Sequence, residues 1–549
     1  MNGMRREKRP MRRSAALLLT AALLCGALCG CGDDGTGKGF RFPLSGEPAQ
    51  LDPQVSADRA SLTLISVLFE GLTRIDDSGA AVPGAAEWTV SDDGLTYTFT
   101  LYESYWSTIS VRGEELPWEE PQRVTADDFV FGIQRAADPQ TRSPLTAQLS
   151  GIKGAQAVID GKQPAETLAV RAQSDSVLTI ELTAPDDGFL LRLASAPFLP
   201  CRRDFFAYTA GRYGLEKRYV LTNGPFSLTA WNHDTSLLLE KNGKYHAAAG
   251  VLPAAVRFVI GADATAQALT EGRMDAVLLS ADEAERARDA GITPVALHDT
   301  VRFLWFSGNT PVLENADIRR ALRDAVEWDA VYAYLTELGE APAAGFVAPD
   351  ATVGGEPFRT ADEAPLCRTD AAAAQAALTA GLAAVYPEDK SPTLPRLTLL
   401  TADDEDSKDL ARYILQSWQK NLHISATLSA VPESELNAAV RSGSCQIAIV
   451  SVTPDGLTGA EGLTMFGSAA GTAAGAALDK AIDAALRGGR AELTALEKQL
   501  DTLCPAVPLS FPVRWYGLAP GDEGITVRPF GGGRYGSPFS FLQAKKFDK

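Results

Sequence analysis

Residues 91–102, SDDGLTYTFTLY, contain the pattern that indicates the fold most clearly. The run Ser-Asp-Asp-Gly at 91–94 is a turn signal, because short polar side chains and glycine suit the backbone angles of a tight turn. The residues that follow alternate threonine with tyrosine, phenylalanine and leucine, a period of two that is typical of a strand with one buried face. Strand-like and turn-like pieces alternate in this way from Phe40 to about Ala136.

Helix patterns join the strands further along the chain. Thr125, with Asp128 three residues later, predicts a capped helix start. Strands are expected at 167–173, 177–184, 226–231, 236–241 and 254–261, and a helical stretch at 264–280. A second block from Val301 predicts strands at 302–308, 395–402, 424–431 and 445–452, and helices at 316–335, 370–384, 407–422, 433–443 and 478–503. This alternation predicts an α/β protein, and the short connections of the second block suit a compact parallel sheet.

The first thirty residues read as a secretion signal. Six basic residues precede the apolar run at 15–28, which is too short to be a good membrane span. The run ends at Leu28-Cys29-Gly30-Cys31, which resembles a bacterial lipobox, so Cys31 is the expected lipid attachment site. The polar stretch 32–39 suits a flexible tether. The alternative is an ordinary cleaved signal.

Composition excludes several classes of protein. The formal net charge is −18, and loss of the signal would make it more negative, so nucleic acid and anionic membrane surfaces would repel the chain. With 45% hydrophobic residues over 549 positions, the chain can form at least two domains. Four cysteines, Cys201, Cys367, Cys445 and Cys504, remain after the expected lipidation of Cys31, and sequence does not choose among their three possible disulfide pairings.

Signals for catalysis or metal binding are weak. Residues 32–39 nearly spell a phosphate loop, but Gly39 stands where Ser or Thr must bind magnesium. The four histidines have no metal-ligand spacing, and no G-x-S-x-G nucleophile elbow occurs. The acidic runs at 403–406, 114–115 and 119–120 are interpreted as solvated surface. No enzyme activity, cofactor or metal is therefore expected.

The stretch 86–99, AEWTVSDDGLTYTF, resembles the N-terminal signature of the bacterial extracellular solute-binding proteins of the oligopeptide, dipeptide and nickel class (family 5), which serve ABC importers. Further landmarks of that family occur in order over the whole mature chain: Glu47-Pro48, Leu51-Asp52-Pro53, Phe69-Glu70-Gly71-Leu72, Val124 to Phe129, Asn223-Gly224-Pro225-Phe226, Lys241-Asn242 and Asp317 to Leu322. The chain departs from the pattern in an insertion at 108–123, in His246 where the family usually has Trp, and in Val452 where it also has Trp.

The resemblance implies an α/β, two-lobed periplasmic-binding-protein-like fold of the large class, with mixed sheets flanked by helices and a ligand cleft between the lobes. The expected organisation is a lipoprotein signal peptide at 1–30 and lipidated Cys31 with its tether at 31–39. Lobe 1 is expected at 40–298, with an extra subdomain at about 77–190. Lobe 2 is expected at 299–512, and the chain returns to lobe 1 at 513–549.

Asp455, in the stretch GSCQIAIVSVTPDG at 443–456, matches the family aspartate that pairs with the α-ammonium group of a bound peptide. Val450, Ser451, Val452 and Thr453 would then pair with the ligand main chain. Trp305 and Asn309 match a strand that lines the family's cleft, although Trp305 can equally be a core residue. For Asp455 the alternative is an Asx turn, since Pro-Asp-Gly is itself a turn former.

The resemblance implies a membrane-anchored extracytoplasmic receptor that binds peptides, most simply oligopeptides, and delivers them to the permease of an ABC transporter. A monomer without nucleic-acid partners is expected. In dipeptide binders an arginine holds the ligand carboxylate, but the corresponding stretch here, 401–406, has no basic residue. A longer peptide or another cationic ligand is therefore favoured. The alternatives are a nickel complex, a glycoside or another non-peptide solute, a secreted hydrolase, and a receptor that signals without transport.

Overall fold

The computed structural model describes residues 39–107, 118, 121–360, 363–454, 459–531 and 536–546. Residues 40–549 form one compact unit. The expected signal at 1–30, Cys31 and its tether up to Lys38 lie outside the described residues, and so does most of the insertion at 108–123. In the part of the chain that is described, no helix has both the length and the apolar character needed to cross a membrane.

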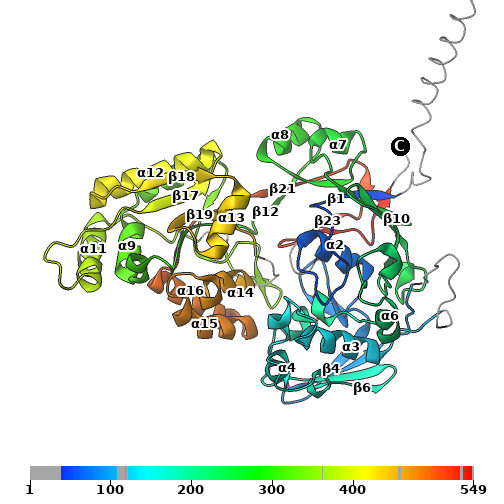
Figure 1. Ribbon diagram of the computed structural model, residues 1–549. Coiled ribbons are helices and arrows are strands. Elements are labelled where there is room, and N and C mark those ends of the chain that lie inside the picture. Colours follow the sequence, from blue (N-terminus) through cyan, green and yellow to red (C-terminus); the bar gives the residue numbers. More distant parts are fainter. Residues whose placement is uncertain are drawn as a thin grey trace, which may run out of the picture. The chain divides into compact units, whose positions relative to one another are not determined.

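Residues 91–102 form the turn and second strand of a hairpin in a small antiparallel sheet. The order is β4 (Ala86–Val90), β5 (Thr96–Leu101), β7 (Val177–Glu181) and β6 (Val170–Ser174). Tyr97, Phe99 and Leu101 are buried, as the period of two predicts. The helices α3 (Ala126–Ala137) and α4 (Ala155–Ile159) lie beside this sheet in Figure 1, and Thr125 and Asp128 form the predicted capping box of α3.

Two further sheets are built from the first 300 residues and the C-terminal segment. One has the order β1 (Phe40–Leu44), β10 (Ala255–Ile260), β9 (Ser236–Lys241) and β8 (Phe226–Asn232). The other has the order β11 (Ala276–Leu279), β21 (Arg514–Leu518) and β12 (Val295–Leu297). The chain after 513 therefore returns to pair with strands that precede residue 298.

The predicted helical stretch at 264–280 is only partly helical. It divides into the short helix α7 (Ala266–Thr270) and the strand β11, and α8 (Ala281–Asp289) follows. Gly272 ends the helix because its positive φ of +67° belongs to the left-handed region that glycine adopts without strain. The apolar residues after it pair with β21, so tertiary pairing decides their conformation.

A six-stranded sheet of described residues lies between 301 and 511. Its order is β14 (Ala341–Pro342), β20 (Ala506–Phe511), β13 (Val301–Phe306), β19 (Ile447–Val452), β17 (Thr398–Ala402) and β18 (Thr427–Val431). The sheet is mixed, because β17 runs parallel to β18 and β19 whereas β13 is antiparallel to both of its neighbours. The predicted parallel arrangement is therefore found in this sheet only for β17, β18 and β19.

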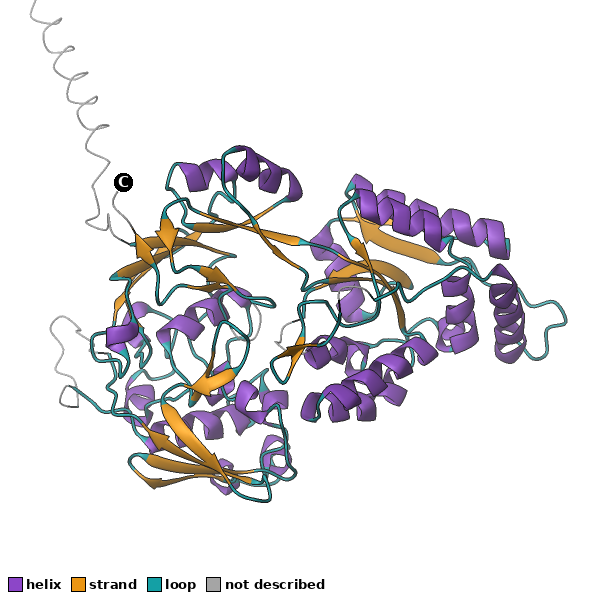
Figure 2. Cartoon of the chain, turned by 180° about the vertical axis from the view of Figure 1, so that it is seen from behind, coloured by secondary structure: helices purple, strands orange, loops and turns teal. Residues whose placement is uncertain are grey.

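Helices cover both faces of this sheet. Alternate residues of β13 enter two separate cores: Leu304 and Phe306 on one face, and Val301, Phe303 and Trp305 on the other. The first core includes residues of α9 (Ala316–Asp324), α10 (Trp328–Glu337), α11 (Ala371–Val385) and α12 (Glu405–Leu422). The second includes residues of α13 (Glu433–Ser442), α15 (Gly475–Arg487) and α16 (Arg490–Leu503). Figure 2 shows these helices on both sides of the strands.

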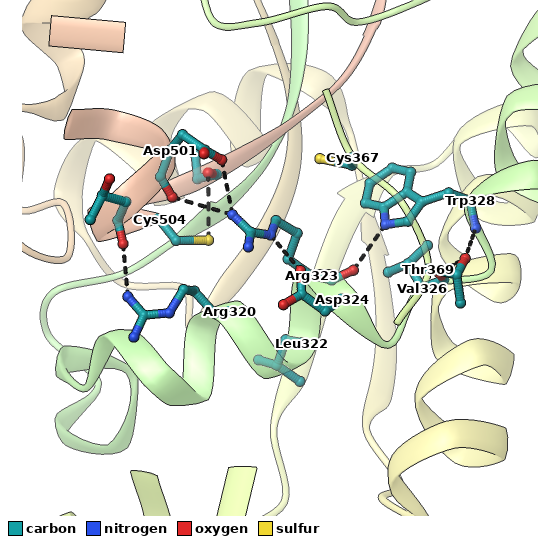
Figure 3. Close-up of polar contacts among 12 residues, drawn as sticks. Arg320, Leu322, Arg323, Asp324, Val326, Trp328, Cys367, Thr369, Asp501 and Cys504 are labelled. Carbon is teal, nitrogen blue, oxygen red and sulfur yellow. Dashed lines mark hydrogen bonds and ion pairs between the residues drawn. The ribbon is translucent and has the colours of Figure 1, made fainter. Parts of the chain in front are cut away.

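Two long helix predictions were wrong in the same way. The stretch 316–335 divides into α9 and α10, because the Thr369 hydroxyl donates to the Val326 carbonyl at 2.7 Å and accepts from the Trp328 amide at 2.9 Å. Figure 3 shows these contacts at the break and the ion pair of Arg323 with Asp501, which ties α9 to the end of α16. The stretch 478–503 divides at Gly488 and Gly489 into α15 and α16.

The remaining described elements are short. They include α2 (Arg59–Leu68), which packs in the core of the N-terminal part, and α5 (Phe189–Arg192), α6 (Arg203–Tyr208) and α14 (Gly459–Gly462). The two-stranded pairs are β2 (Thr73–Ile75) with β3 (Ala81–Pro83), β15 (Thr352–Val353) with β16 (Glu356–Pro357), β22 (Asp522–Glu523) with β25 (Lys545–Lys546), and β23 (Thr526–Val527) with β24 (Phe539–Ser540). Cys201, Cys367, Cys445 and Cys504 are all free thiols.

Candidate functional site

A cavity of about 720 Å³ lies where the parallel strands β17 and β19 separate, and we call it the strand-end cavity. The two strands pair only at Leu399 with Ile447 and at Leu400 with Ala448. Two residues later, Ala402 and Val450 both line the cavity. The carboxyl ends of parallel strands are where α/β folds usually place ligands, since the sheet leaves a gap there and helix N-termini point toward it.

The separation leaves one edge of β19 open. From Ile449 to Val452 the strand pairs with β13 on one side, and the described part of the chain places no strand on the other. Ile449, Val450 and Ser451 line the cavity along this edge. An open edge next to a cavity can accept an extended chain, because its backbone N–H and C=O groups pair with main chain of any sequence.

A buried ion pair closes one side of the cavity. Arg302 of β13 contacts Glu340 at 2.6 Å, and the Ser510 hydroxyl of β20 donates to the other carboxylate oxygen of Glu340. Glu340 is only 8% exposed. Burial raises the pKa of Glu340, and the Arg302 charge and the Ser510 hydrogen bond oppose that rise. The Arg302 charge is thus already neutralised by a carboxylate of the protein.

The N-terminus of α12 forms another side. Asp404 caps the helix and accepts a hydrogen bond from the Ser407 amide at 2.8 Å. Burial alone would raise the pKa of Asp404, but the hydrogen bonds from Ser407 and the Arg302 charge hold it below its ordinary value. Asp403 and Asp406 also line the cavity. These carboxylates outweigh the partial positive charge of about +0.5 at a helix N-terminus.

Further lining residues come from α8, from α13, from the segment that leads into β21 and from Trp515 of β21. The guanidinium of Arg288 lies 4.5 Å from the centre of the Trp515 ring, a cation–π contact. In total, the lining contains two arginines, Arg288 and Arg302, and seven carboxylates: Glu285, Glu337, Glu340, Asp403, Asp404, Asp406 and Glu433. The cavity is therefore strongly negative. The described residues contain no cluster of three His, Cys, Asp or Glu that could hold a metal ion.

The sequence-predicted site residues divide into three groups. Val450 and Ser451 line the cavity, whereas Val452 and Thr453 follow them without lining it. The Thr453 hydroxyl lies 2.7 Å from that of Thr300, in the segment that leads into β13. Asp455 and Cys31 lie outside the described residues.

Trp305 and Asn309 do not line the cavity. Trp305 is 1% exposed, packs in the core beneath the sheet, and donates its indole N–H to the Thr472 hydroxyl at 3.2 Å. Trp305 is thus a core aromatic of this sheet. Asn309 follows the other end of β13 from Arg302, and its side-chain amide donates to the Gly443 carbonyl at 3.1 Å. Both residues stabilise the sheet instead of facing the strand-end cavity.

Sequence reasoning missed the ion pair and the cavity that the acidic run adjoins. Arg302, Glu340 and Ser510 come from three separate segments, and nothing local marks them as neighbours. The run at 403–406 was interpreted as solvated surface, and its four residues are exposed, but Asp403, Asp404 and Asp406 also line the cavity. The position of the run in the sequence could have indicated a site, because the run directly follows a buried strand and starts a helix.

Comparison with known proteins identifies the family. The model for the bacterial extracellular solute-binding proteins, family 5 (middle), matches residues 81–474. The chain belongs to this family. Family 5 is made up of substrate-binding proteins.

Relatives and solved structures agree with this assignment. The chain is 27% identical to the dipeptide-binding protein DppE of Bacillus subtilis over 387 residues, which is 70% of this chain and 68% of DppE. It is also 27% identical to the oligopeptide-binding protein OppA of the same organism over 432 residues, 75% of each chain. The structure of Listeria monocytogenes OppA bound to peptide superposes with a TM-score of 0.71 at 22% identity, over 94% of this chain and all of that one. The two-lobed periplasmic-binding-protein-like fold is thereby confirmed.

Proposed function

We propose that this protein captures peptides, most simply oligopeptides, in the strand-end cavity and delivers them to the membrane permease of an ABC importer, without changing them chemically. The observation that carries the proposal is the open edge of β19 from Ile449 to Val452 beside a cavity of about 720 Å³. Relatives named as dipeptide- and oligopeptide-binding proteins support the same class of ligand.

The open edge explains how one site can bind many peptides. An extended ligand offers the same N–H and C=O groups whatever its side chains, so main-chain pairing with Val450, Ser451, Val452 and Thr453 gives affinity without side-chain selectivity. Asp455 is the third residue after Val452, where this edge ends. Its carboxylate would hold the free amino end of the ligand through a charge-assisted hydrogen bond and so fix the register.

The proposal includes the location of the protein. Cys31 would carry the lipid that anchors the protein outside the cytoplasm, and the polar stretch 32–39 would leave the receptor, residues 40–549, free to reach the permease. The domain limits expected from the sequence belong to the same proposal, with lobe 1 at 40–298, lobe 2 at 299–512 and the return at 513–549. The proposal includes a monomeric receptor.

The role of Asp455 can be tested by substitution. Asp455→Ala should fold normally and lose most of its affinity for peptides with a free amino end, because the ammonium group loses its charged partner. N-acetylated peptides should bind the parent and the variant equally, since they have no ammonium group. Isothermal titration with one peptide in both forms measures this. Equal binding of free and acetylated peptide by the parent protein would contradict the assignment.

The ligand class is tested by native mass spectrometry of the purified protein after exposure to a mixed peptide library. Retention of peptides in a narrow range of lengths is the expected result. A nickel complex or a sugar bound in place of peptide would overturn the ligand class and leave the family assignment intact.

A further inference from the structure

We propose that Thr300 is a positioning residue for peptide binding. Through its contact with Thr453 it fixes the chain at the end of β19, so that the main chain there is already in place to pair with a ligand. This inference rests on the proposed function, because it assumes that peptides pair with the open edge of β19. It goes further by naming a residue that does not line the strand-end cavity and acts on the ligand only through Thr453.

The first argument is that the backbone pairing of β13 with β19 stops before Thr453. Among the described residues, the last backbone pair of these two strands is Val301 opposite Val452. In the same antiparallel register, the next two residues to face each other are Thr300 and Thr453. Their hydroxyl oxygens lie 2.7 Å apart, a hydrogen-bond distance. A side-chain contact therefore continues the pairing by one residue, and cross-strand threonine pairs of this kind stabilise sheets.

The second argument is that Thr300 is itself held firmly. The preceding residue, Asp299, is fully buried and accepts two hydrogen bonds from the guanidinium of Arg514 in β21, of which the one from Nε is 2.7 Å long. It also accepts from the Phe530 amide at 2.7 Å. Thr300 is only 5% exposed, and its hydroxyl lies 3.4 Å from the Asp299 carboxylate. Because separating a buried ion pair is costly, the chain at Thr300 is fixed independently of any ligand.

The third argument is that the residue after Thr453 is also held. Pro454 is buried, and it packs against Gly462 at the end of α14. A Cβ atom on Gly462 would lie 2.5 Å from Cγ of the proline ring, so this close approach requires glycine at position 462. The chain that leaves β19 is therefore held at two successive residues, by Thr300 and by α14.

The consequence for binding follows from conformational entropy. A strand end that is free to move must be ordered when a ligand pairs with it, and this ordering lowers the affinity. An end that is fixed before the ligand arrives avoids that loss. Removing the Thr300 hydroxyl should therefore weaken peptide binding although Thr300 touches no part of the cavity.

The test begins with three variants and an alanine pentapeptide with free ends, studied by isothermal titration. Thr300→Val keeps the branched shape and removes the hydroxyl, and it should lower the affinity about fivefold, as expected for the loss of one hydrogen bond. Thr300→Ser restores a hydroxyl and should bind nearly as tightly as the parent. The control Thr427→Val changes an exposed threonine of β18 in the same sheet and should leave the affinity unchanged.

A second measurement separates positioning from a general loss of structure. It uses versions of the same pentapeptide that are methylated on one backbone nitrogen at a time, so that one main-chain donor is removed in each. In the parent, methylation of the nitrogen that pairs at the end of β19 should lower the affinity about tenfold or more. In Thr300→Val the same methylation should cost about threefold or less, with the costs at the other nitrogens unchanged. Thr453→Val, which removes the other hydroxyl of the pair, should give the same pattern.

Each result has a distinct meaning. An unchanged affinity in Thr300→Val, or a loss by the same factor for every methylated peptide, would overturn the positioning role and leave the proposed function standing. A Thr300→Ser variant that binds as weakly as Thr300→Val would show that the hydroxyl is not responsible. If the unmodified pentapeptide failed to bind the parent, the proposed function itself would fall.

Discussion

The strand-end cavity and a second, larger cavity differ in how their carboxylates are engaged. The larger one, about 800 Å³, contains Glu70 and is here called the Glu70 cavity. Tyr245 donates its hydroxyl to one oxygen of Glu70 at 2.5 Å, and His246 donates from its ring to the other at 2.6 Å. In the strand-end cavity, Asp403 and Glu433 have no such partners among the described residues.

The difference separates structural from functional charge. Glu70 is 6% exposed, and its partners occupy both of its oxygens, so it can offer little to a ligand. Burial and the nearby Glu70 charge raise the pKa of Tyr245, which keeps the hydroxyl protonated as a donor. Size alone would therefore direct attention to the wrong cavity, whereas the state of the carboxylates points to the smaller one.

The largest expected effect on stability is at Glu70. Glu70→Ala should destabilise the protein by about 3 kcal/mol, because it leaves two buried donors, Tyr245 and His246, without their acceptor. Urea unfolding followed by tryptophan fluorescence measures the change, and Glu70→Gln, which can still accept one of the two hydrogen bonds, should lose less. Peptide binding should be unaffected under conditions in which the variants remain folded. A loss of binding with normal stability would show that Glu70 has a direct functional role.

A second engaged carboxylate of the N-terminal part makes stability depend on pH. Burial raises the pKa of Asp128 to about 6, although hydrogen bonds from Thr125 and Trp106 oppose the rise. Because the pKa in the folded state exceeds the ordinary 3.8, this group's contribution to stability is complete below about pH 4 and is lost as the pH rises through about 6. The free energy of unfolding of the parent relative to Asp128→Asn should therefore fall by about 2 kcal/mol between pH 4 and pH 7.

Paired unfolding curves at several pH values test this dependence. The Asn side chain is uncharged throughout, so it serves as the reference for every other titrating group. A difference between parent and variant that stays constant from pH 4 to pH 7 would contradict a raised pKa at Asp128.

Local signals predicted the parts of the fold that depend on neighbouring residues. The capping box of Thr125 and Asp128 and the alternating burial of β5 were predicted correctly, because the interacting groups lie within a few residues. The break between α9 and α10 was missed, since it depends on Thr369, more than forty residues later. The order of β13, β19 and β17 depends on long-range pairing that no local pattern encodes.

The candidate site was predictable to a similar degree. Val450 and Ser451, which the family resemblance names, line the cavity, and their pairing with a ligand stays a prediction. The Arg302 and Glu340 pair was missed, because the two residues meet only when β13 and the segment before β14 come together. Asp403 was interpreted as solvated surface and is exposed, and the separation of β17 from β19 also gives it a cavity to line, which no local pattern shows.

The smallest expected effect on stability is at Asp403, in the strand-end cavity. Asp403→Asn should change the free energy of unfolding by less than about 0.5 kcal/mol, since an unpartnered exposed carboxylate contributes little to the folded state. Asp404→Ala, one residue later, should cost about 1 kcal/mol because it removes the N-cap of α12. Thermal and urea unfolding of the two variants measure this contrast. A large destabilisation by Asp403→Asn would contradict the contrast, because it would mean that the Asp403 carboxylate stabilises the fold as Glu70 does.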